Sequence, residues 1–285
     1  MFGDSLFDED HSLYTKDRVT SQFKTAKVLV TVKSIPQPSA TYGDTVCVAG
    51  IWVDGDQMKW IRLYPIPFRS MAELDQFSKY EIIELPVLPN QSDFRPESYK
   101  PDRSGIVHRG NVQGWQNRNK YIAPLADRWT MCEIQAKVRA GGGADTYPSL
   151  AVIRPRKILD LVIGTFEGWT EDQKRNVEAA FIQEDLFSEN LPPKRKLEEP
   201  RFKAVFSYLC MSNTCNGHNQ TFIDWELEAF SRRHRESSEE KAISEIRKRF
   251  LDVRCNPAKE PLFFVGNLKA KTLAYNVLGI YSANG

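Results

Sequence analysis

Short runs of alternating apolar and polar residues dominate the first third of the chain and predict β-strands there. Residues 27–33, 45–53, 59–64 and 80–85 are rich in β-branched and aromatic side chains, which favour strands. Asp54-Gly55, between two of these runs, is typical of a hairpin turn. Four short strands joined by tight turns predict a small antiparallel sheet or barrel.

The pattern changes in the middle of the chain. Residues 89–130 are rich in Pro, Asn, Arg and Gly, and they predict a long irregular connection of the kind that often carries function. Residues 132–138 predict a further strand, and residues 149–163 predict two strand-like pieces. A short helix is expected within residues 71–77.

Helical periodicity is clearest toward the C-terminus. Residues 171–182 predict a helix capped by Thr170. Residues 239–251 predict an amphipathic helix with apolar residues on one stripe and basic residues on the other faces. Residues 222–234 start extended or continue directly into a helix. Three further runs predict strands, namely residues 202–209, 261–265 and 275–281.

These elements together predict an α+β fold divided into four parts. Residues 1–22 are expected to form a flexible acidic N-terminus, and residues 23–189 a β-rich domain. Residues 190–200, which contain Pro192-Pro193, predict a linker or exposed loop. Residues 201–285 predict an α+β domain built as a strand, a zinc-binding turn, a helix and two strands.

Composition and net charge limit the kinds of partner that the chain is expected to bind, but they do not identify a partner. The chain has 285 residues with 39 Lys and Arg against 37 Asp and Glu, so its net charge of +2 provides no global field for a polyanion. No apolar run approaches the ~20 residues of a membrane span, so no membrane partner is predicted. The acidic start lacks the basic-then-apolar order of a signal peptide, which predicts a cytoplasmic location.

Cysteine and histidine gather in one segment and suggest a metal site. The five cysteines are odd in number and irregular in spacing, so reduced thiols are expected, with Cys47 and Cys132 as plain core residues. Cys210, Cys215 and His218 fall within nine residues, around a glycine at 217 that can adopt positive φ.

Thiolate and imidazole ligands suit zinc, so these three residues predict a structural zinc site. Cys255 is the expected fourth ligand, with His234 as the reserve. The alternative is a metal-free turn that carries two thiols and a surface histidine.

Two carboxylates follow this segment and allow two interpretations. Asp224 and Glu226 would point to one face of a strand, where they could bind Mg²⁺ in a nuclease or act as general acid and base. If residues 224–226 open a helix instead, Asp224 would be its N-cap and Trp225 would be buried. The capping interpretation is the favoured one.

Arginine and aromatic residues recur side by side in the N-terminal half. On a small sheet they are typical of single-stranded nucleic-acid binding, through base stacking and phosphate contacts. The alternative is that the rings lie in the core and the arginines pair with acids. The candidate nucleic-acid-binding residues are Trp60, Arg62, Tyr64, Arg69, Arg95, Trp115, Arg118, Arg154 and Arg156.

Six short motifs give the chain a resemblance to a known family. They are TVCVAGI at 45–51, WIRLYP at 60–65, RPES at 95–98, AVIRP at 151–155, DWE at 224–226 and FFVG at 263–266. In this order they resemble a family of uncharacterised bacterial proteins. The resemblance covers most of the chain and implies one integrated protein, with a place in accessory or phage-defence gene neighbourhoods. It implies no catalytic residues.

Three functions from different classes follow as expectations. The leading one is an intracellular nucleic-acid-binding protein with structural zinc, which uses the face formed by Trp60, Arg62 and Arg69. The second is a Mg²⁺-dependent nuclease or hydrolase that uses Asp224 and Glu226. The third is a non-catalytic subunit that binds a protein partner through the basic face of residues 239–251.

Overall fold

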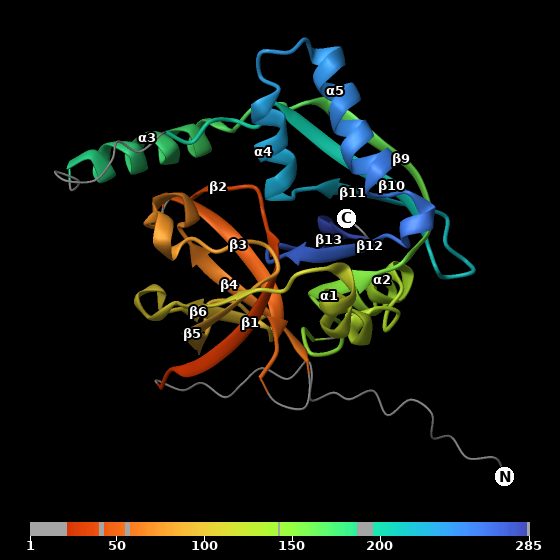
Figure 1. The fold of residues 1–285 in the computed structure, drawn as a ribbon, viewed down its shortest axis with the longest axis horizontal. Coiled ribbons are helices and arrows are strands. Elements are labelled where there is room, and N and C mark those ends of the chain that lie inside the picture. The colour runs from red at the N-terminus through yellow and green to blue at the C-terminus, as the bar shows by residue number, and fades with distance from the viewer. Residues whose placement is uncertain (1–21, 40–42, 55–57, 142, 187–195, 284–285) are drawn as a thin grey trace.

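The computed structural model describes residues 22–39, 43–54, 58–141, 143–186 and 196–283. Almost all of the expected flexible N-terminus and residues 190–195 of the expected linker lie outside these ranges. A β-barrel and a six-stranded sheet lie against each other, with helices on the far side of the sheet (Figure 1). The predicted α+β class and the predicted small barrel are both confirmed.

Five strands close into the N-terminal barrel. Around the barrel their order is β1 (Lys24–Lys33), β3 (Gly43–Trp52), β4 (Lys59–Ile66), β6 (Ser98–Pro101) and β5 (Glu81–Pro89). Closure comes from the antiparallel pairing of β5 with β1, and only β4 and β6 are parallel. Counted along the barrel strands alone, the order is 1-2-3-5-4, which is the Greek-key order of an OB-fold barrel.

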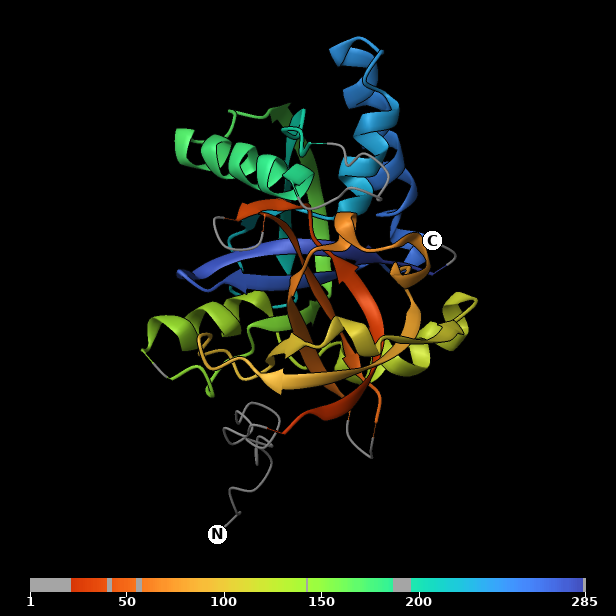
Figure 2. The same ribbon diagram turned by 90° about the vertical axis from the view of Figure 1, so that its left-hand side faces the viewer.

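Two short strands extend the barrel sheet. They are β2 (Gln37–Ser39), which pairs with β3, and β7 (Val107–Asn111), which pairs with β5. The helix α3 (Glu171–Leu186) contacts β2 and β3 (Figure 2). As predicted, Thr170 caps this helix, because its hydroxyl accepts from the Gln173 backbone N–H at 3.3 Å.

Alternation along each barrel strand separates an interior face from an exterior face. In β1, Val28 and Val30 point into the barrel core, whereas Leu29 belongs to the interface with the second sheet. Gly50 on β3 allows the close approach of β1, since a Cβ there would lie 2.5 Å from Val28 Cγ1 and 2.6 Å from the Leu29 oxygen. Larger residues at 50 would therefore force these two strands apart.

The second sheet contains strands from both sides of the expected linker. Its order is β8 (Leu150–Ile153), β12 (Leu262–Leu268), β13 (Lys271–Tyr281), β11 (His218–Phe222), β10 (Phe202–Cys210) and β9 (Pro155–Thr165). Only β11 and β13 pair in parallel. The expected linker, residues 190–200, therefore falls within the connection between β9 and β10, which also contains α3 and joins two hydrogen-bonded neighbours of one sheet.

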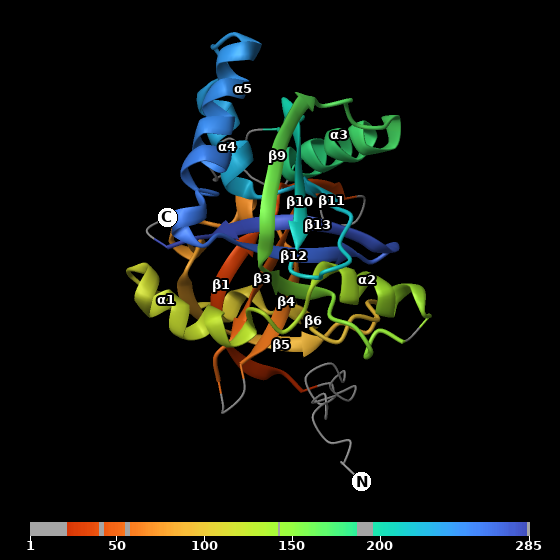
Figure 3. The same ribbon diagram turned by 90° about the vertical axis from the view of Figure 1, so that its right-hand side faces the viewer.

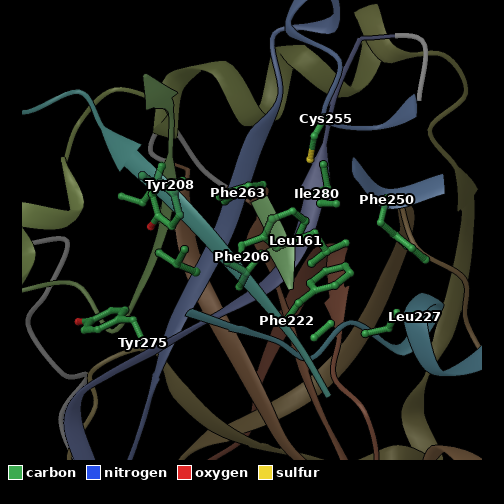
Figure 4. Packing of buried hydrophobic residues seen from close by; sticks show 14 of the residues in the cluster. Leu161, Phe206, Tyr208, Phe222, Leu227, Phe250, Cys255, Phe263, Tyr275 and Ile280 are labelled. Carbon is green, nitrogen blue, oxygen red and sulfur yellow. The ribbon is translucent and has the colours of Figure 1, made fainter. Parts of the chain in front are cut away.

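The second sheet is apolar on both faces, and alternate residues along its strands pack against different neighbours. Val152 and Phe264 pack toward the barrel, while Ile153 and Phe263 pack toward the helices. Figure 4 shows the aromatic core on the helical side, where Phe206 lies close to Phe263. The helices on that side are α2 (Met131–Arg139), α4 (Trp225–Arg233) and α5 (Glu239–Arg247), which continues into a π-helical turn, Lys248–Val253.

Two predictions of local structure are wrong. Residues 132–138 form the helix α2 rather than a strand, because Thr130 and Glu133 make a reciprocal capping box at its start. Residues 89–130 are not irregular throughout, since they contain β6, β7 and the helix α1 (Trp115–Ile122). The short helix expected within residues 71–77 is present as a single 3₁₀ turn, Glu73–Asp75.

A helix needs about 20 mostly apolar residues to cross a membrane. The described part of the chain contains no helix that is long and apolar enough to do so.

Candidate metal centre

Three cysteines and one histidine converge at the end of β10. Cys210 is the last residue of β10, Cys215 lies in the following turn, His218 opens β11, and Cys132 lies in the first turn of α2. Their ligand atoms all lie within 4.8 Å of one another. Figure 3 shows the turn between β10 and β11 running toward α2, which brings together two segments almost 80 residues apart in the chain.

The local sequence shapes this turn around the Cys215 sulfur. Gly217 adopts φ +113°, as the sequence predicts, a region that other residues rarely enter. Burial alone would raise the pKa of the Cys215 thiol, but backbone N–H groups of Cys210 and Gly217 donate to its sulfur and lower that pKa. The Cys210 nitrogen lies 3.3 Å from this sulfur. The turn therefore favours a thiolate at Cys215.

Cys132 completes the group from the opposite side. Its Sγ lies 3.6 Å from Cys210 Sγ and 3.5 Å from His218 Nε2. Burial and the neighbouring thiols raise the pKa of Cys132 to about 12. Burial also lowers the pKa of His218, which favours the neutral imidazole that a metal requires. Several thiolates can share this space only if a cation is present.

Two of the separations between the ligand atoms agree with a tetrahedral zinc site. Zinc–sulfur bonds of ~2.3 Å and zinc–nitrogen bonds of ~2.0 Å place two sulfurs ~3.8 Å apart and a sulfur and a nitrogen ~3.5 Å apart. The observed distances are 3.6 Å between Cys210 Sγ and Cys132 Sγ, and 3.5 Å between Cys132 Sγ and His218 Nε2. The chain thus provides a Cys₃His group that can bind a metal such as zinc.

Sequence reasoning placed three of these four residues together and missed the fourth. Cys210, Cys215 and His218 lie together, but Cys255 is not among the clustered ligand atoms and is instead buried in the hydrophobic core (Figure 4). His234 contacts the Phe230 backbone oxygen at 2.9 Å through Nδ1. Cys132 was expected to be a plain core residue because its segment was interpreted as a strand. The capping pattern at 130–133 could have identified the helix, although not the ligand.

The predicted carboxylate pair lies at the start of α4 among basic side chains. Asp224 accepts from the Glu226 backbone N–H at 2.9 Å and is the N-cap of α4. Lys79 Nζ lies 3.2 Å from Asp224 Oδ2 and 3.5 Å from Glu226 Oε2, and Arg254 also pairs with Glu226. Two acids therefore face two cations, and these contacts favour the capping interpretation over a Mg²⁺ site.

Burial and charge set the protonation of this group. Burial alone would raise the pKa of Glu226, but Lys79 and Arg254 outweigh it and lower that pKa to about 2. Asp224 is almost completely buried, and burial raises its pKa despite the charge of Lys79. Since Lys79 precedes β5 of the barrel and the acids lie on α4, this charge cluster links the two halves of the molecule.

Two of the predicted nucleic-acid-binding arginines are buried between the barrel and the second sheet. Arg62 donates to the Ser149 backbone oxygen at 3.2 Å and to Ser149 Oγ at 3.1 Å. Arg95 pairs with Asp93 at 2.6 Å and donates to the Asn267 backbone oxygen at 2.9 Å. Both side chains are less than 10% exposed, so they join the two halves rather than face solvent.

The other predicted binding residues do not form one surface. Arg69 donates to the Lys196 backbone oxygen, Arg118 lies 4.2 Å from the Tyr80 ring centroid, and Arg154 pairs with Asp127. Tyr64 accepts from the Thr45 hydroxyl, and Arg156 is exposed on β9. Trp60 lines a cleft between the halves, whereas Trp115 and Arg154 line a separate polar cavity of about 120 Å³.

The basic face expected to bind a protein partner is partly engaged within the chain. Arg247 donates to Asp160 Oδ1 at 2.8 Å and also to the Leu161 backbone oxygen. The Arg249 guanidinium lies 5.0 Å from the Phe230 ring centroid, and Lys248 is exposed. The amphipathic helix predicted at 239–251 is confirmed as α5 with its π-helical continuation.

Comparison with known protein families divides the chain where the structure divides. Residues 24–124, which include every barrel strand, match the family described as Domain of unknown function (DUF8758). Residues 127–284, more than half of the chain, contain the second sheet and all four candidate metal ligands, and match a second family. No curated protein matches the chain. The resemblance to an uncharacterised family is thus confirmed, and the chain belongs to the family described as Domain of unknown function (DUF8757).

Proposed function

We propose that Cys132, Cys210, Cys215 and His218 bind one zinc ion and that this zinc is structural. The observation that carries the proposal is the convergence of the four ligand atoms within 4.8 Å of one another, with 3.6 Å between Cys132 Sγ and Cys210 Sγ and 3.5 Å between Cys132 Sγ and His218 Nε2. Four protein ligands leave no open position for a substrate, which supports a structural rather than a catalytic metal. The ion would join α2 to the turn between β10 and β11.

Metal analysis of variants tests this assignment. The purified chain is expected to contain about one zinc per molecule, and Co²⁺ in its place should give the absorption of a tetrahedral thiolate site. Cys132→Ala should lose the metal, whereas the matched variant Cys255→Ala should retain it. His218→Cys keeps four ligands, so it should still bind Co²⁺, with stronger thiolate-to-cobalt absorption.

Two other outcomes would contradict this set of four ligands. If Cys255→Ala loses the metal and Cys132→Ala retains it, the fourth ligand is Cys255, as the sequence pattern indicated. If the wild-type chain and the His218→Cys variant bind neither zinc nor Co²⁺, the group is a set of reduced thiols and the proposal is wrong.

For the molecule as a whole, we propose a single-stranded nucleic-acid-binding module. The specific support is the Greek-key strand order of the barrel, which is shared with oligonucleotide-binding OB-folds. In such barrels the second and third strands and the loop after the fourth strand contact the ligand, which correspond here to β3, β4 and residues 90–97. The second sheet packs against much of this face, so a ligand would reach it at its edge, where Trp60 of β4 lines the cleft between the halves. This support is an analogy of fold, and nucleic-acid binding by the chain itself is its direct test.

A gel assay with labelled single- and double-stranded DNA and RNA provides the test, with and without Mg²⁺ or Mn²⁺. A shift with single strands, without cleavage, is expected. Its midpoint should move to higher protein concentration as salt increases, because bound phosphates release counterions. Metal-dependent cleavage that Asp224→Asn abolishes would replace this proposal with the nuclease, and the absence of any shift would overturn it.

A further inference from the structure

A cleft opens where the barrel meets the second sheet. It contains about 450 Å³ of empty space, part of which is open to solvent. Its walls come from the start of β4, from the end of the loop before β6, from the residues preceding α2 and from the start of β8. The side chains on which the inference depends are Lys59, Trp60, Glu97, Arg128, Trp129 and Ser149.

Two tryptophans provide the apolar surface of the cleft. Trp60 is held edge-on against Phe264 of the second sheet, with ring centroids 6.0 Å apart. Trp129 lies against the helical core, and Lys137 Nζ lies 5.1 Å from its ring centroid. Both indoles are only partly buried, so each presents a fixed aromatic surface to a ligand at low entropic cost.

Basic residues border the cleft, and a polar network lies along its wall. Arg128 is exposed, and its Nε donates to the Pro124 backbone oxygen at 2.6 Å. Lys59 is partly exposed, and its Nζ lies 4.7 Å from the Trp52 ring centroid, a contact that it would exchange for a phosphate. On the wall, the Ser149 hydroxyl donates to Glu97, and Arg62 Nη2 donates to Ser149 Oγ. Arg62 Nε is buried without a hydrogen-bond partner in the described residues. These contacts fix the Glu97 carboxylate as an acceptor for an amino group.

The side chains that line the cleft favour a flat heterocycle that carries an amino group and a phosphate. The indoles can contact the face of such a ring, the Glu97 carboxylate can accept from its amino group, and the basic side chains can bind the phosphate.

We infer that this cleft binds a nucleobase that carries a phosphate. Trp60 and Trp129 stack against the base, Glu97 accepts from its exocyclic amino group, and Lys59 and Arg128 contact the phosphate. The inference rests on the proposed nucleic-acid-binding function, and both a base within a strand and a free nucleotide supply the same chemistry. Trp129 precedes the candidate metal ligand Cys132 by three residues, so zinc would fix this wall of the cleft.

Fluorescence anisotropy with labelled single-stranded oligonucleotides tests the aromatic contact. Trp129→Leu is expected to weaken binding by about 10-fold, and Trp129→Phe should restore most of the affinity because a stacking ring remains. Trp115→Leu is the matched control, since Trp115 lines the separate polar cavity, and it should bind like the wild type. Zinc content, measured on every variant, identifies those that keep their fold.

The charge contact is tested by salt dependence. Lys59→Gln with Arg128→Gln should weaken binding and reduce the slope of log affinity against log salt by about 1.4, as expected for two lost phosphate contacts on a single strand. The control pair Lys100→Gln and Arg103→Gln, also exposed on the barrel half, should leave the slope unchanged.

The outcomes separate this inference from the proposed function. If the wild type binds single strands but Trp129→Leu and Trp115→Leu bind equally well, base binding in the cleft is refuted, whereas the proposed nucleic-acid-binding function stands. If the wild type binds neither strands nor mononucleotides, both are refuted. Displacement of the oligonucleotide by mononucleotides identifies a free nucleotide as the ligand, and failure of mononucleotides to compete identifies a base within a strand.

Discussion

Several single residues at the junction of the two halves act through charge. Asp93 and Arg95 form a buried pair, and Ser98 also donates to Asp93 at 2.9 Å. Burial alone would raise the pKa of Asp93, but Arg95 outweighs it and lowers that pKa to about 2 from the ordinary value of 3.8. As pH falls, the unfolded chain therefore takes up this proton first, so acid favours unfolding.

Asp93→Asn should reveal the pH dependence of this pair. Its stabilisation is complete above about pH 4 and disappears as pH falls toward 2. The variant should lower the free energy of unfolding by about 2 kcal/mol at pH 7, and the difference from wild type should shrink by pH 3. Urea unfolding at both pH values is the measurement, with the exposed Asp145→Asn as control. A difference that stays constant with pH would contradict the assignment.

Gly217 is the residue-scale determinant of the chelating turn. Its φ of +113° strains any other residue, although a Cβ would have space, since the nearest atom is 4.0 Å away. Gly217→Ala should therefore weaken zinc binding, measured by competition with a chelator, while the folded secondary structure persists in circular dichroism. Gly164→Ala, on β9 with an open Cβ position and no positive φ, is the control and should leave zinc affinity unchanged.

At the scale of elements, the helix α2 connects the candidate metal centre to the proposed cleft. Its capping box fixes where the helix begins, and its first turn carries Cys132 while the preceding residue pair, 128–129, lines the cleft. A strand at 132–138 would alternate its side chains between two faces, whereas the helix turns Cys132 toward His218 and Met131 into the core.

Removing this cap should affect both stability and metal binding. Thr130→Ala is expected to cost about 1 kcal/mol of unfolding free energy and to weaken zinc binding, because Cys132 loses its fixed position. Ser238→Ala removes an equivalent N-cap from α5, far along the chain from the ligands, so it should cost similar stability with unchanged zinc affinity. Equal zinc affinities in the two variants would contradict the role given to α2. Thermal unfolding and chelator competition are the measurements.

At the scale of the whole molecule, the barrel and the second sheet depend on one another. Leu29 and Ile51 on the outside of the barrel pack with Val152 and Phe264 of the sheet. The Ile35 N–H also donates to the Ile223 backbone oxygen at 2.8 Å, beside the buried charge cluster of Lys79 and Asp224. Two halves that share a core and buried charges are expected to unfold together.

Asp224→Asn tests this coupling. The variant leaves Lys79 buried with a weaker partner, which should cost about 3 kcal/mol, and the unfolding transition should move as a single step. Differential scanning calorimetry measures both effects, because a two-state transition has equal calorimetric and van't Hoff enthalpies. The exposed Glu240→Gln is the control. Two separated transitions would show that the halves fold independently.

Local pattern alone was enough to predict much of the fold. The strands at 27–33, 45–53 and 59–64, the amphipathic helix at 239–251 and the capped helix at 171–182 are predictable because periodicity and capping act between near neighbours. The metal turn was predictable for the same reason, since Cys210, Cys215 and His218 lie close together in the chain.

Only the tertiary structure could decide the fourth candidate ligand and the fate of the arginines. Cys132 joins the other ligands across almost 80 residues, a proximity created by strand pairing and helix packing that no local pattern records. Arg62 lies between aromatic residues in the sequence, a pattern typical of a nucleic-acid-binding surface. The second sheet covers its strand, however, so the Arg62 side chain is buried and bonds to Ser149. Chain neighbours determine the local conformation of a residue, whereas its exposure depends on which distant segment packs against it.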